Sequence, residues 1–350
     1  MKKWKLLVAV GLLAIMLLAL YIKLPVQYDV PAFEARNGTQ YWLLDEGVTI
    51  GYTHVAAKGT EKKEPVIYLH GGPGGKITDA IIEVLMPLRE DGHDLYFYDQ
   101  VGSGHSTRLA DISQYSVDRH REDLRSIVAR IGAPKIILVG HSWGGCLAMN
   151  YLQSFPETVS KLVLSGPGPI LPIQRQLKML CPPDGLELKA PENSNQEGNE
   201  KVYSWRTKVI LKGAYLLNTK WISDREADDF FTLLNQELIK STDCLGEQVG
   251  KAEGGGGYYS HIMTVKSFDN VEDKRAAFKD LTIPILLLRG QCDNQPWGYV
   301  QEYLDLLPNV QFHLIEGVGH GIINRKGEEY CTLIRAFLEE EAQTKPTQQF

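Results

Sequence analysis

The sequence predicts an α/β fold, with a mostly parallel sheet that carries helices on both faces. Short apolar runs alternate with helix-like stretches over most of the 350-residue chain. The alternation stops near residue 166 and resumes near residue 280, which indicates an inserted, mainly helical cap. An uncharged apolar run also stands near the N-terminus, directly after several lysines, and it predicts a transmembrane helix.

The N-terminal run, Leu6–Ile22, has the properties of a membrane anchor. As a helix it would span roughly 25 Å, slightly less than the hydrocarbon core of a bilayer. Trp4 and Tyr21 stand at its two ends, where interfacial aromatic residues belong. No pair of small residues marks a cleavage site after it, so we expect a retained anchor. A cleaved signal peptide and a buried soluble helix are the alternatives.

The basic residues before this run are expected to stay in the cytoplasm. The prediction is therefore a single-pass protein of the cell membrane with its main body outside the cytoplasm, or a secreted protein if the segment is cleaved. We expect an anchor over 1–27, a first core part over 28–166, a cap over 167–280 and a second core part over 281–350.

The elements of the core follow from the hydrophobic patterns. Continuous apolar runs are typical of parallel strands that are covered on both faces. Strands are predicted at 65–70, 95–99, 135–140, 161–165, 283–290 and 310–316, after leading antiparallel strands within 42–55. Helices are predicted near 78–90, 117–131, 143–155, 298–307 and 325–340.

The cap is predicted from a change of pattern after the strand at 161–165. Turn residues in "SGPGPILP" open the region, which is then polar and helix-rich until strand patterning returns at Ile283. Such an insertion would lie over the C-terminal edge of the sheet. A continued irregular stretch of the main domain is the alternative.

Composition excludes several classes of function. The net charge is −6 and no long basic tract follows the N-terminus, so no nucleic-acid partner is expected. The five cysteines are widely spread without a C-x-x-C pair, so neither a metal knuckle nor a disulfide framework is implied. A location outside the cytoplasm permits a disulfide without requiring one.

Cofactor motifs are also incomplete. Lys76 is followed by Ile77, which breaks the phosphate-loop pattern, and Thr107 stands where a dinucleotide loop needs glycine. The sequence contains no H-E-x-x-H motif. We expect no metal and no cofactor, and the sequence does not indicate an oligomeric state.

Ser142 is the candidate nucleophile. It stands in Gly140-x-Ser142-x-Gly144, between a predicted strand and a predicted helix. A serine on such a turn needs small neighbours, and the turn lifts its hydroxyl above the sheet. The structural alternative is a tight turn in which Ser142 only caps the helix.

A serine hydroxyl needs a base, and the usual order on this architecture is serine, acid, histidine. His320 follows the last predicted strand through "GVGH", and Asp293 follows the preceding strand. A carboxylate there would orient the imidazole and stabilise its protonated form. Roles as helix caps or loop residues are the alternatives for both.

Two glycine-containing loops complete the pattern. "HGGPGG" (70–75) follows a strand, and one of its N–H groups, with that of Trp143, would bind an oxyanion. In the loop 96–106, Asp99 is expected to accept backbone hydrogen bonds and to organise the turn.

Together these stretches resemble the α/β-hydrolase fold and, within it, the proline iminopeptidase family of serine aminopeptidases. The resemblance rests on "HGGPGG", "DQVGSGHS", "GHSWGG", Asp293 and "GVGH". It implies that Ser142 is the nucleophile, His320 the base and Asp293 the orienting acid. It also implies oxyanion donors at the amides of Gly72 and Trp143, and a small peptide or aminoacyl substrate.

The family's cap supplies carboxylates that hold the substrate's ammonium group. Glu253 is the preferred candidate for this role and Glu226 the second, with solvated surface carboxylates as the alternative. The chain departs from the family at Val101, where arginine is usual, and in a cap that does not align clearly. An esterase or lipase of the same fold is therefore the rival function, and a non-catalytic binding module is a more distant one.

Overall fold

A single eight-stranded sheet organises the protein. The computed structural model describes residues 2–59, 61–191, 194–244 and 252–340. The strand order is β1-β2-β4-β3-β5-β6-β7-β8, with β2 antiparallel to its two neighbours and every other pair parallel. The strands are β1 (Thr39–Leu43), β2 (Thr49–Val55), β3 (Val66–Leu69), β4 (Leu95–Tyr98), β5 (Ile136–His141), β6 (Val159–Ser165), β7 (Ile285–Gly290) and β8 (Val310–Ile315).

The central strands are buried on both faces, which confirms the interpretation of their continuous apolar runs. Every residue of β3 is buried, and so is every residue of β7. Parallel strands of this kind need helices on both sides, because each face is too apolar to meet water.

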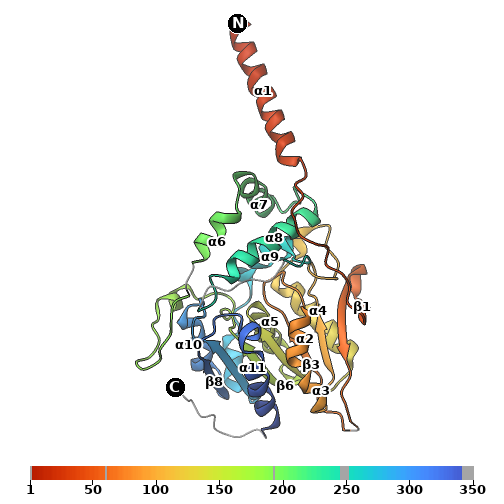
Figure 1. The fold of residues 1–350 in the computed structure, drawn as a ribbon, viewed down its shortest axis with the longest axis vertical. Helices are drawn as coiled ribbons and strands as arrows, with labels where there is room; N and C mark the ends of the chain where they lie inside the picture. Colours follow the sequence, from red (N-terminus) through yellow and green to blue (C-terminus); the bar gives the residue numbers. More distant parts are fainter. Residues whose placement is uncertain (1, 60, 192–193, 245–251, 341–350) are drawn as a thin grey trace.

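Two groups of helices cover the two faces (Figure 1). One hydrophobic cluster joins the sheet to α4 (Val117–Ile131), α5 (Trp143–Ser154) and α10 (Trp297–Leu306). The other joins it to α2 (Asp79–Leu85), α3 (Pro87–Glu90) and α11 (Ile322–Glu339). The predicted α/β fold is therefore confirmed.

Local signals explain the helix bounds. α4 begins after Ser116, whose side chain accepts a hydrogen bond from the Arg119 amide, and ends at Gly132 in the left-handed conformation. The helix predicted over 78–90 is divided into α2 and α3, because Pro87 cannot continue the hydrogen-bond ladder of α2.

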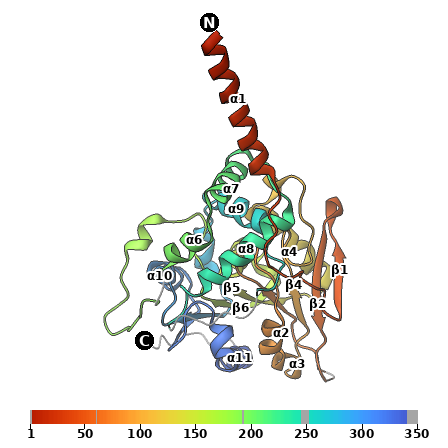
Figure 2. The same ribbon diagram turned by 45° about the horizontal axis from the view of Figure 1, so that its top comes forward.

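Helices of the segment between β6 and β7 lie over one end of the sheet (Figures 1 and 2). They are α6 (Asn195–Val202), α7 (Trp205–Leu217), α8 (Asp224–Ile239) and α9 (Tyr258–Lys266). The Gly257 amide donates to the Gly74 carbonyl at 2.8 Å, and His261 Nδ1 lies 3.0 Å from the Pro73 carbonyl oxygen. The segment therefore contacts the loop after β3, at the carboxyl end of a parallel strand. The proposed limits of the cap, 167 and 280, remain predictions.

α1 (Lys2–Lys23) projects away from the rest of the chain (Figures 1 and 2). Its span Lys3–Lys23 is long and apolar enough to cross a membrane, and none of it is buried in protein. A signal sequence would have the same properties.

Candidate active site

Ser142 occupies a strained turn between β5 and α5. Its backbone has φ 54° and ψ −120°, a conformation that non-glycine residues rarely adopt. A Cβ atom at Gly140 would lie 2.5 Å from the Gly144 carbonyl oxygen. One at Gly144 would lie 2.0 Å from the Leu69 carbonyl oxygen. Both glycines are therefore required, as the motif predicts, for the chain to turn this sharply against β3.

His320 and Asp293 meet at the carboxyl ends of β8 and β7. His320 Nδ1 lies 3.0 Å and 3.1 Å from the two carboxylate oxygens of Asp293. The Asp293 side chain is fully buried and also accepts a hydrogen bond of 2.9 Å from the Gln295 amide. The structure thus brings together the two residues that the sequence placed 27 positions apart.

The electrostatics of this pair favour a charged carboxylate beside a basic imidazole. Burial alone would raise the pKa of Asp293, but the positive charges of His320 and Arg289 and the hydrogen bond from His320 outweigh it and lower the pKa to about 2. Burial alone would lower the pKa of His320, but the charge and hydrogen bond of Asp293 raise it above 6.5.

Ser142 and His320 line the same cavity, which has a volume of about 380 Å³. Gly72, the predicted oxyanion donor of the loop after β3, also lines it. The Cβ of an alanine at Gly71 would lie 3.1 Å from the Ser142 Cβ, so this loop runs directly beside the serine. Apolar side chains form much of the wall: Tyr68, Ile81, Leu238, Ile239 and Ile323.

Trp143 places its amide at the first position of α5, where helical N–H groups have no partner inside the helix. Its indole Nε1 donates to Gln100 Oε1 at 2.7 Å. Gln100 in turn binds His70 through two hydrogen bonds of 2.9 Å, one from its backbone amide and one from its side chain. Gln100 therefore ties the turn after β4 to both predicted oxyanion loops, a role that the sequence analysis missed.

The predicted structural role of Asp99 is confirmed by its hydrogen bonds. Its carboxylate accepts hydrogen bonds from the amides of Ile77 and His105, at 2.8 Å and 2.9 Å. A Cβ at Gly104 would lie 2.0 Å from the Asp99 Cγ, so this turn closes tightly around the carboxylate.

His141 stands next to Ser142 in sequence but makes other contacts. Its Nδ1 lies 3.1 Å from the Ser165 carbonyl oxygen, and its ring centroid lies 5.0 Å from that of His320. Burial, followed by the charge of His320, lowers its pKa to about 3. His141 is therefore neutral at physiological pH, and its ring lies beside the ring of His320.

The two carboxylates predicted for substrate binding lie in different surroundings. Glu253 is exposed, and its carboxylate lies 3.6 Å from the ammonium of Lys76, which lines the cavity. Glu226 is buried on α8 and forms an ion pair of 2.7 Å with Arg206. Among the described residues, Asp243 is the carboxylate that lines the cavity, and the sequence analysis did not single it out.

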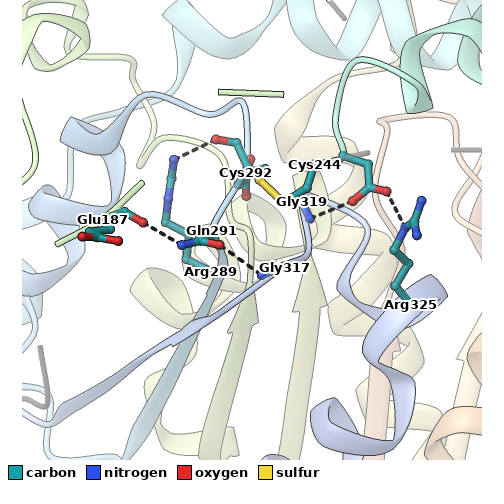
Figure 3. Close-up of a disulfide and its surroundings, with 10 residues drawn as sticks. Glu187, Cys244, Arg289, Gln291, Cys292, Gly317, Gly319 and Arg325 are labelled. Carbon is teal, nitrogen blue, oxygen red and sulfur yellow. Dashed lines mark hydrogen bonds and ion pairs between the residues drawn. A yellow bond between two sulfur atoms is a disulfide. The ribbon is translucent and has the colours of Figure 1, made fainter. Parts of the chain in front are cut away.

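A disulfide joins Cys244 to Cys292, immediately before Asp293 (Figure 3). The sequence implied no disulfide framework, because two cysteines 48 positions apart carry no motif. The other three cysteines, Cys146, Cys181 and Cys331, are free. Within the described parts of the chain, no group of three or more His, Cys, Asp and Glu side chains is arranged to hold a metal ion.

Comparison with known proteins identifies the family to which this fold belongs. A family model described as the alpha/beta hydrolase fold matches residues 64–323. The proline iminopeptidase of Heyndrickxia coagulans is 27% identical over 78% of this chain and 90% of its own length. That of Clostridium botulinum is 24% identical over 82% of this chain and 94% of its own length.

Solved structures share the fold at lower identity. The proline iminopeptidase of Mycobacterium smegmatis superposes with a TM-score of 0.56 at 17% identity, covering 86% of this chain and 97% of its own. An esterase from Exiguobacterium antarcticum gives the same TM-score at 18% identity, covering 86% and 99%.

Proposed function

Because the chain belongs to the α/β-hydrolase fold family, we propose that it is a serine hydrolase that releases N-terminal residues from small peptides or aminoacyl compounds. The family match and the proline iminopeptidase relatives support a hydrolase. The observation that carries the proposal is the hydrogen-bonded His320–Asp293 pair, whose imidazole lines the same cavity as Ser142.

In the proposed reaction, Ser142 Oγ attacks the scissile carbonyl carbon while His320 Nε2 accepts the hydroxyl proton. Asp293 holds the imidazole through Nδ1 and stabilises its positive charge. His320 then donates the proton to the leaving amine. A water molecule, deprotonated by His320, attacks the ester carbonyl, and its proton returns to Ser142 as the acid product leaves.

The oxyanion of each tetrahedral intermediate would be held by the amides of Gly72 and Trp143. Support comes from the position of the loop after β3 beside Ser142 and from the place of Trp143 at the start of α5. Preorganised donors of this kind contribute about 3–4 kcal/mol to transition-state binding.

Substitution of Ser142 by alanine tests the proposal. We expect turnover of proline arylamides to fall by at least roughly a thousandfold, because the nucleophile is lost while the fold is retained. A fluorophosphonate probe should label the native protein at Ser142 and fail to label the variant. Turnover within about tenfold of the native rate in the folded variant would contradict the assignment.

For recognition of the substrate's ammonium group we propose Glu253 as the first candidate. Its exposed carboxylate lies beside Lys76, which lines the cavity, whereas the carboxylate of Glu226 is buried in its ion pair with Arg206. A carboxylate there would attract a free amino terminus and favour cleavage after the first residue.

The largely apolar wall of the cavity favours a second candidate function, hydrolysis of small carboxylic esters. A panel of aminoacyl arylamides and short acyl esters distinguishes the two. Higher kcat/KM for substrates with a free amino group supports the aminopeptidase, and higher values for the esters support the esterase.

We further propose that α1 is a retained anchor and that the catalytic part lies outside the cytoplasm. The support is the apolar, unburied span Lys3–Lys23 with lysines at its start. The disulfide is compatible with an oxidising compartment.

A further inference from the structure

The disulfide Cys244–Cys292 lies next to both proposed partners of Ser142. Cys292 precedes Asp293 directly, and its amide donates to the Val318 carbonyl at 3.0 Å, in the loop that leads to His320. Cys244 belongs to the segment that follows α8 and therefore comes from the region of the predicted cap. The bond thus connects this segment to the loop of the acid (Figure 3).

The segment that follows α8 also contacts the loop that carries His320. The His320 amide donates to the Thr242 carbonyl at 2.7 Å, and the Gly319 amide donates to Asp243 Oδ1 at 3.1 Å. A Cβ at Gly319 would lie 1.7 Å from the Thr242 carbonyl oxygen, so the two segments are in direct backbone contact. Asp243 also forms an ion pair with Arg325 of α11, which follows His320 (Figure 3).

We infer that Asp243 and the Cys244–Cys292 disulfide are positioning residues for His320 and Asp293, an inference that rests on the proposed hydrolase function. Both partners of Ser142 stand on loops, and loops hold catalytic geometry less firmly than helices or strands. The segment 242–244 is joined to the loop of Asp293 by the disulfide and to the loop of His320 by two hydrogen bonds. It therefore restricts the separation of the imidazole and the carboxylate.

Kinetics of the variant with both Cys244→Ser and Cys292→Ser test the disulfide. We expect kcat to fall roughly 10- to 100-fold with little change in KM, since misplacement of the base by about 1 Å has an effect of this size. The acid-side midpoint of the kcat/KM profile should also move to lower pH, because a looser Asp293 raises the pKa of His320 less. Treating the native enzyme with a dithiol should reproduce both changes. Cys181→Ser, at an exposed free cysteine, is the control.

Two substitutions at Asp243 test the hydrogen bond to the base loop. Asp243→Asn keeps an oxygen that can accept from the Gly319 amide, whereas Asp243→Ala removes it. We expect the alanine variant to lose kcat in the same way and the asparagine variant to recover most of it. Equal loss in both variants would show that charge pairing with Arg325, not positioning through Gly319, is what matters.

The positioning inference and the proposed function fail in different ways. The serine double variant could have a lower melting temperature while its kcat and pH midpoint stay unchanged at a temperature where it is folded. That result would make the disulfide only a stabilising crosslink. Native protein that neither turns over substrate nor reacts with fluorophosphonate at Ser142 would instead overturn the hydrolase assignment.

Helix α7 carries apolar residues on its exposed side as well as on its buried side. Ile210, Leu211 and Ala214 are buried against the rest of the protein. On the exposed side, Trp205, Val209 and Leu216, which are 52%, 40% and 62% exposed, lie around Lys212, and Leu217 at the end of the helix is 64% exposed. A helix at a water-facing surface normally turns polar residues outward, so this outer face indicates an apolar partner. We call these four residues the outer face of α7.

α7 lies near the C-terminal end of α1, the predicted membrane helix (Figures 1 and 2). The Tyr21 ring stacks on Trp205 with centroids 5.7 Å apart. Arg206 Nη2 donates to the Leu24 carbonyl at 2.5 Å, one residue beyond the end of α1. A bilayer crossed by α1 therefore ends at the level where α7 begins.

We propose that the outer face of α7 docks into the boundary between headgroups and acyl chains of the bilayer that α1 enters. Trp205 has the amphipathic ring that favours this depth. Lys208 and Lys212 are exposed on the same helix and can extend their ammonium groups to lipid phosphates. The proposal rests on α1 being a retained anchor.

Quenching of tryptophan fluorescence tests the docking. The full-length protein is reconstituted in phosphatidylcholine–phosphatidylglycerol vesicles whose acyl chains carry bromine. We expect the native protein to lose more fluorescence than Trp205→Phe, because bromine near the boundary quenches Trp205. The Trp4→Phe variant reports separately on insertion of α1. The Trp42→Phe variant, on β1, is the control: it removes emission that bromine does not quench, so the absolute loss of fluorescence per molecule should stay the same.

The two variants separate the possible failures. Quenching of Trp4 without quenching of Trp205 would overturn the docking while leaving the anchor intact. In that case, crosslinking of two chains through α7 would assign its outer face to a second copy. Quenching of neither residue would overturn both the docking and the anchor.

Discussion

At the scale of single residues, the proposed chemistry depends on a serine whose backbone is held in an unfavourable conformation. A non-glycine residue at φ 54° costs about 1–3 kcal/mol, which the packing of β5, α5 and the loop after β3 must offset. The conformation carries the Ser142 side chain to the carboxyl edge of the sheet, the edge at which Asp293 and His320 also lie.

The pH dependence of turnover is predicted from the His320–Asp293 pair. His320 acts as a base only when neutral, and Asp293 raises its pKa above 6.5, so kcat/KM should fall as the pH drops through a midpoint above 6.5. Asp293→Asn removes the negative charge and should move this midpoint to lower pH, besides lowering the rate. Arylamide hydrolysis measured between about pH 5 and pH 9 checks both effects. An unchanged midpoint in the variant would show that the group titrating is not His320.

Glu253→Gln tests recognition of the amino terminus. Loss of one charge-assisted contact, worth about 1.5–3 kcal/mol, should raise KM for aminoacyl arylamides roughly 10- to 100-fold. Short acyl esters lack the ammonium group, so their KM should not change. Glu272→Gln removes another exposed carboxylate and is the matched control. Equal effects of Glu253→Gln on both substrate classes would exclude an ammonium contact.

At the scale of elements, the helices over the sheet are joined by buried ion pairs. Arg206 of α7 and Glu226 of α8 pair at 2.7 Å with both side chains less than a tenth exposed. A buried charge that loses its partner is strongly unfavourable, because it keeps the cost of leaving water without the compensating attraction. We therefore interpret this pair as part of the packing between α7 and α8.

Glu226→Ala should lower the free energy of unfolding by about 3–5 kcal/mol, since Arg206 would remain buried without its partner. Replacing both residues by leucine should recover most of the loss, because no unpaired charge then remains. Urea unfolding at constant pH measures both values. A small loss of stability together with a large rise in KM for aminoacyl substrates would instead return Glu226 to the role of ammonium ligand.

At the scale of the whole molecule, the proposal that α1 is a retained anchor places the protein at a membrane. The unburied apolar span of α1 cannot be stabilised by the rest of the described chain and needs an apolar surrounding. In the proposed anchored form, the contacts of Tyr21 with Trp205 and of Leu24 with Arg206 would orient the rest of the protein relative to the membrane.

We predict that the protein remains in the membrane fraction after alkaline carbonate washing, and that its intact mass includes the N-terminal residues. Leu13→Arg, in the middle of the span, should weaken retention, because a charged residue there costs about 2.5–3.5 kcal/mol on insertion. Mass spectrometry of the extracted protein checks processing. A soluble form that begins near residue 28 would favour a cleaved signal peptide.

Much of the fold and of the candidate site was predictable because the relevant signals are local. Apolar runs mark the buried strands, and Pro87 and Gly132 mark helix ends. The glycines around Ser142 indicate a turn in which their positions have no room for a side chain. Ser142, Asp293 and His320 each follow the carboxyl end of a strand in the parallel part of the sheet, and this was enough to predict a common edge, because parallel strands end together.

What the tertiary structure alone decides are contacts between segments that are far apart in sequence. The pairing of Cys244 with Cys292, the link from Gln100 to Trp143 and the stacking of Tyr21 on Trp205 have no local signature. Burial also separates Glu226, held by Arg206, from the exposed Glu253, although both are simply glutamates in the sequence. Each of these contacts depends on how distant segments of the chain are brought together, and local periodicity and short motifs do not encode that path.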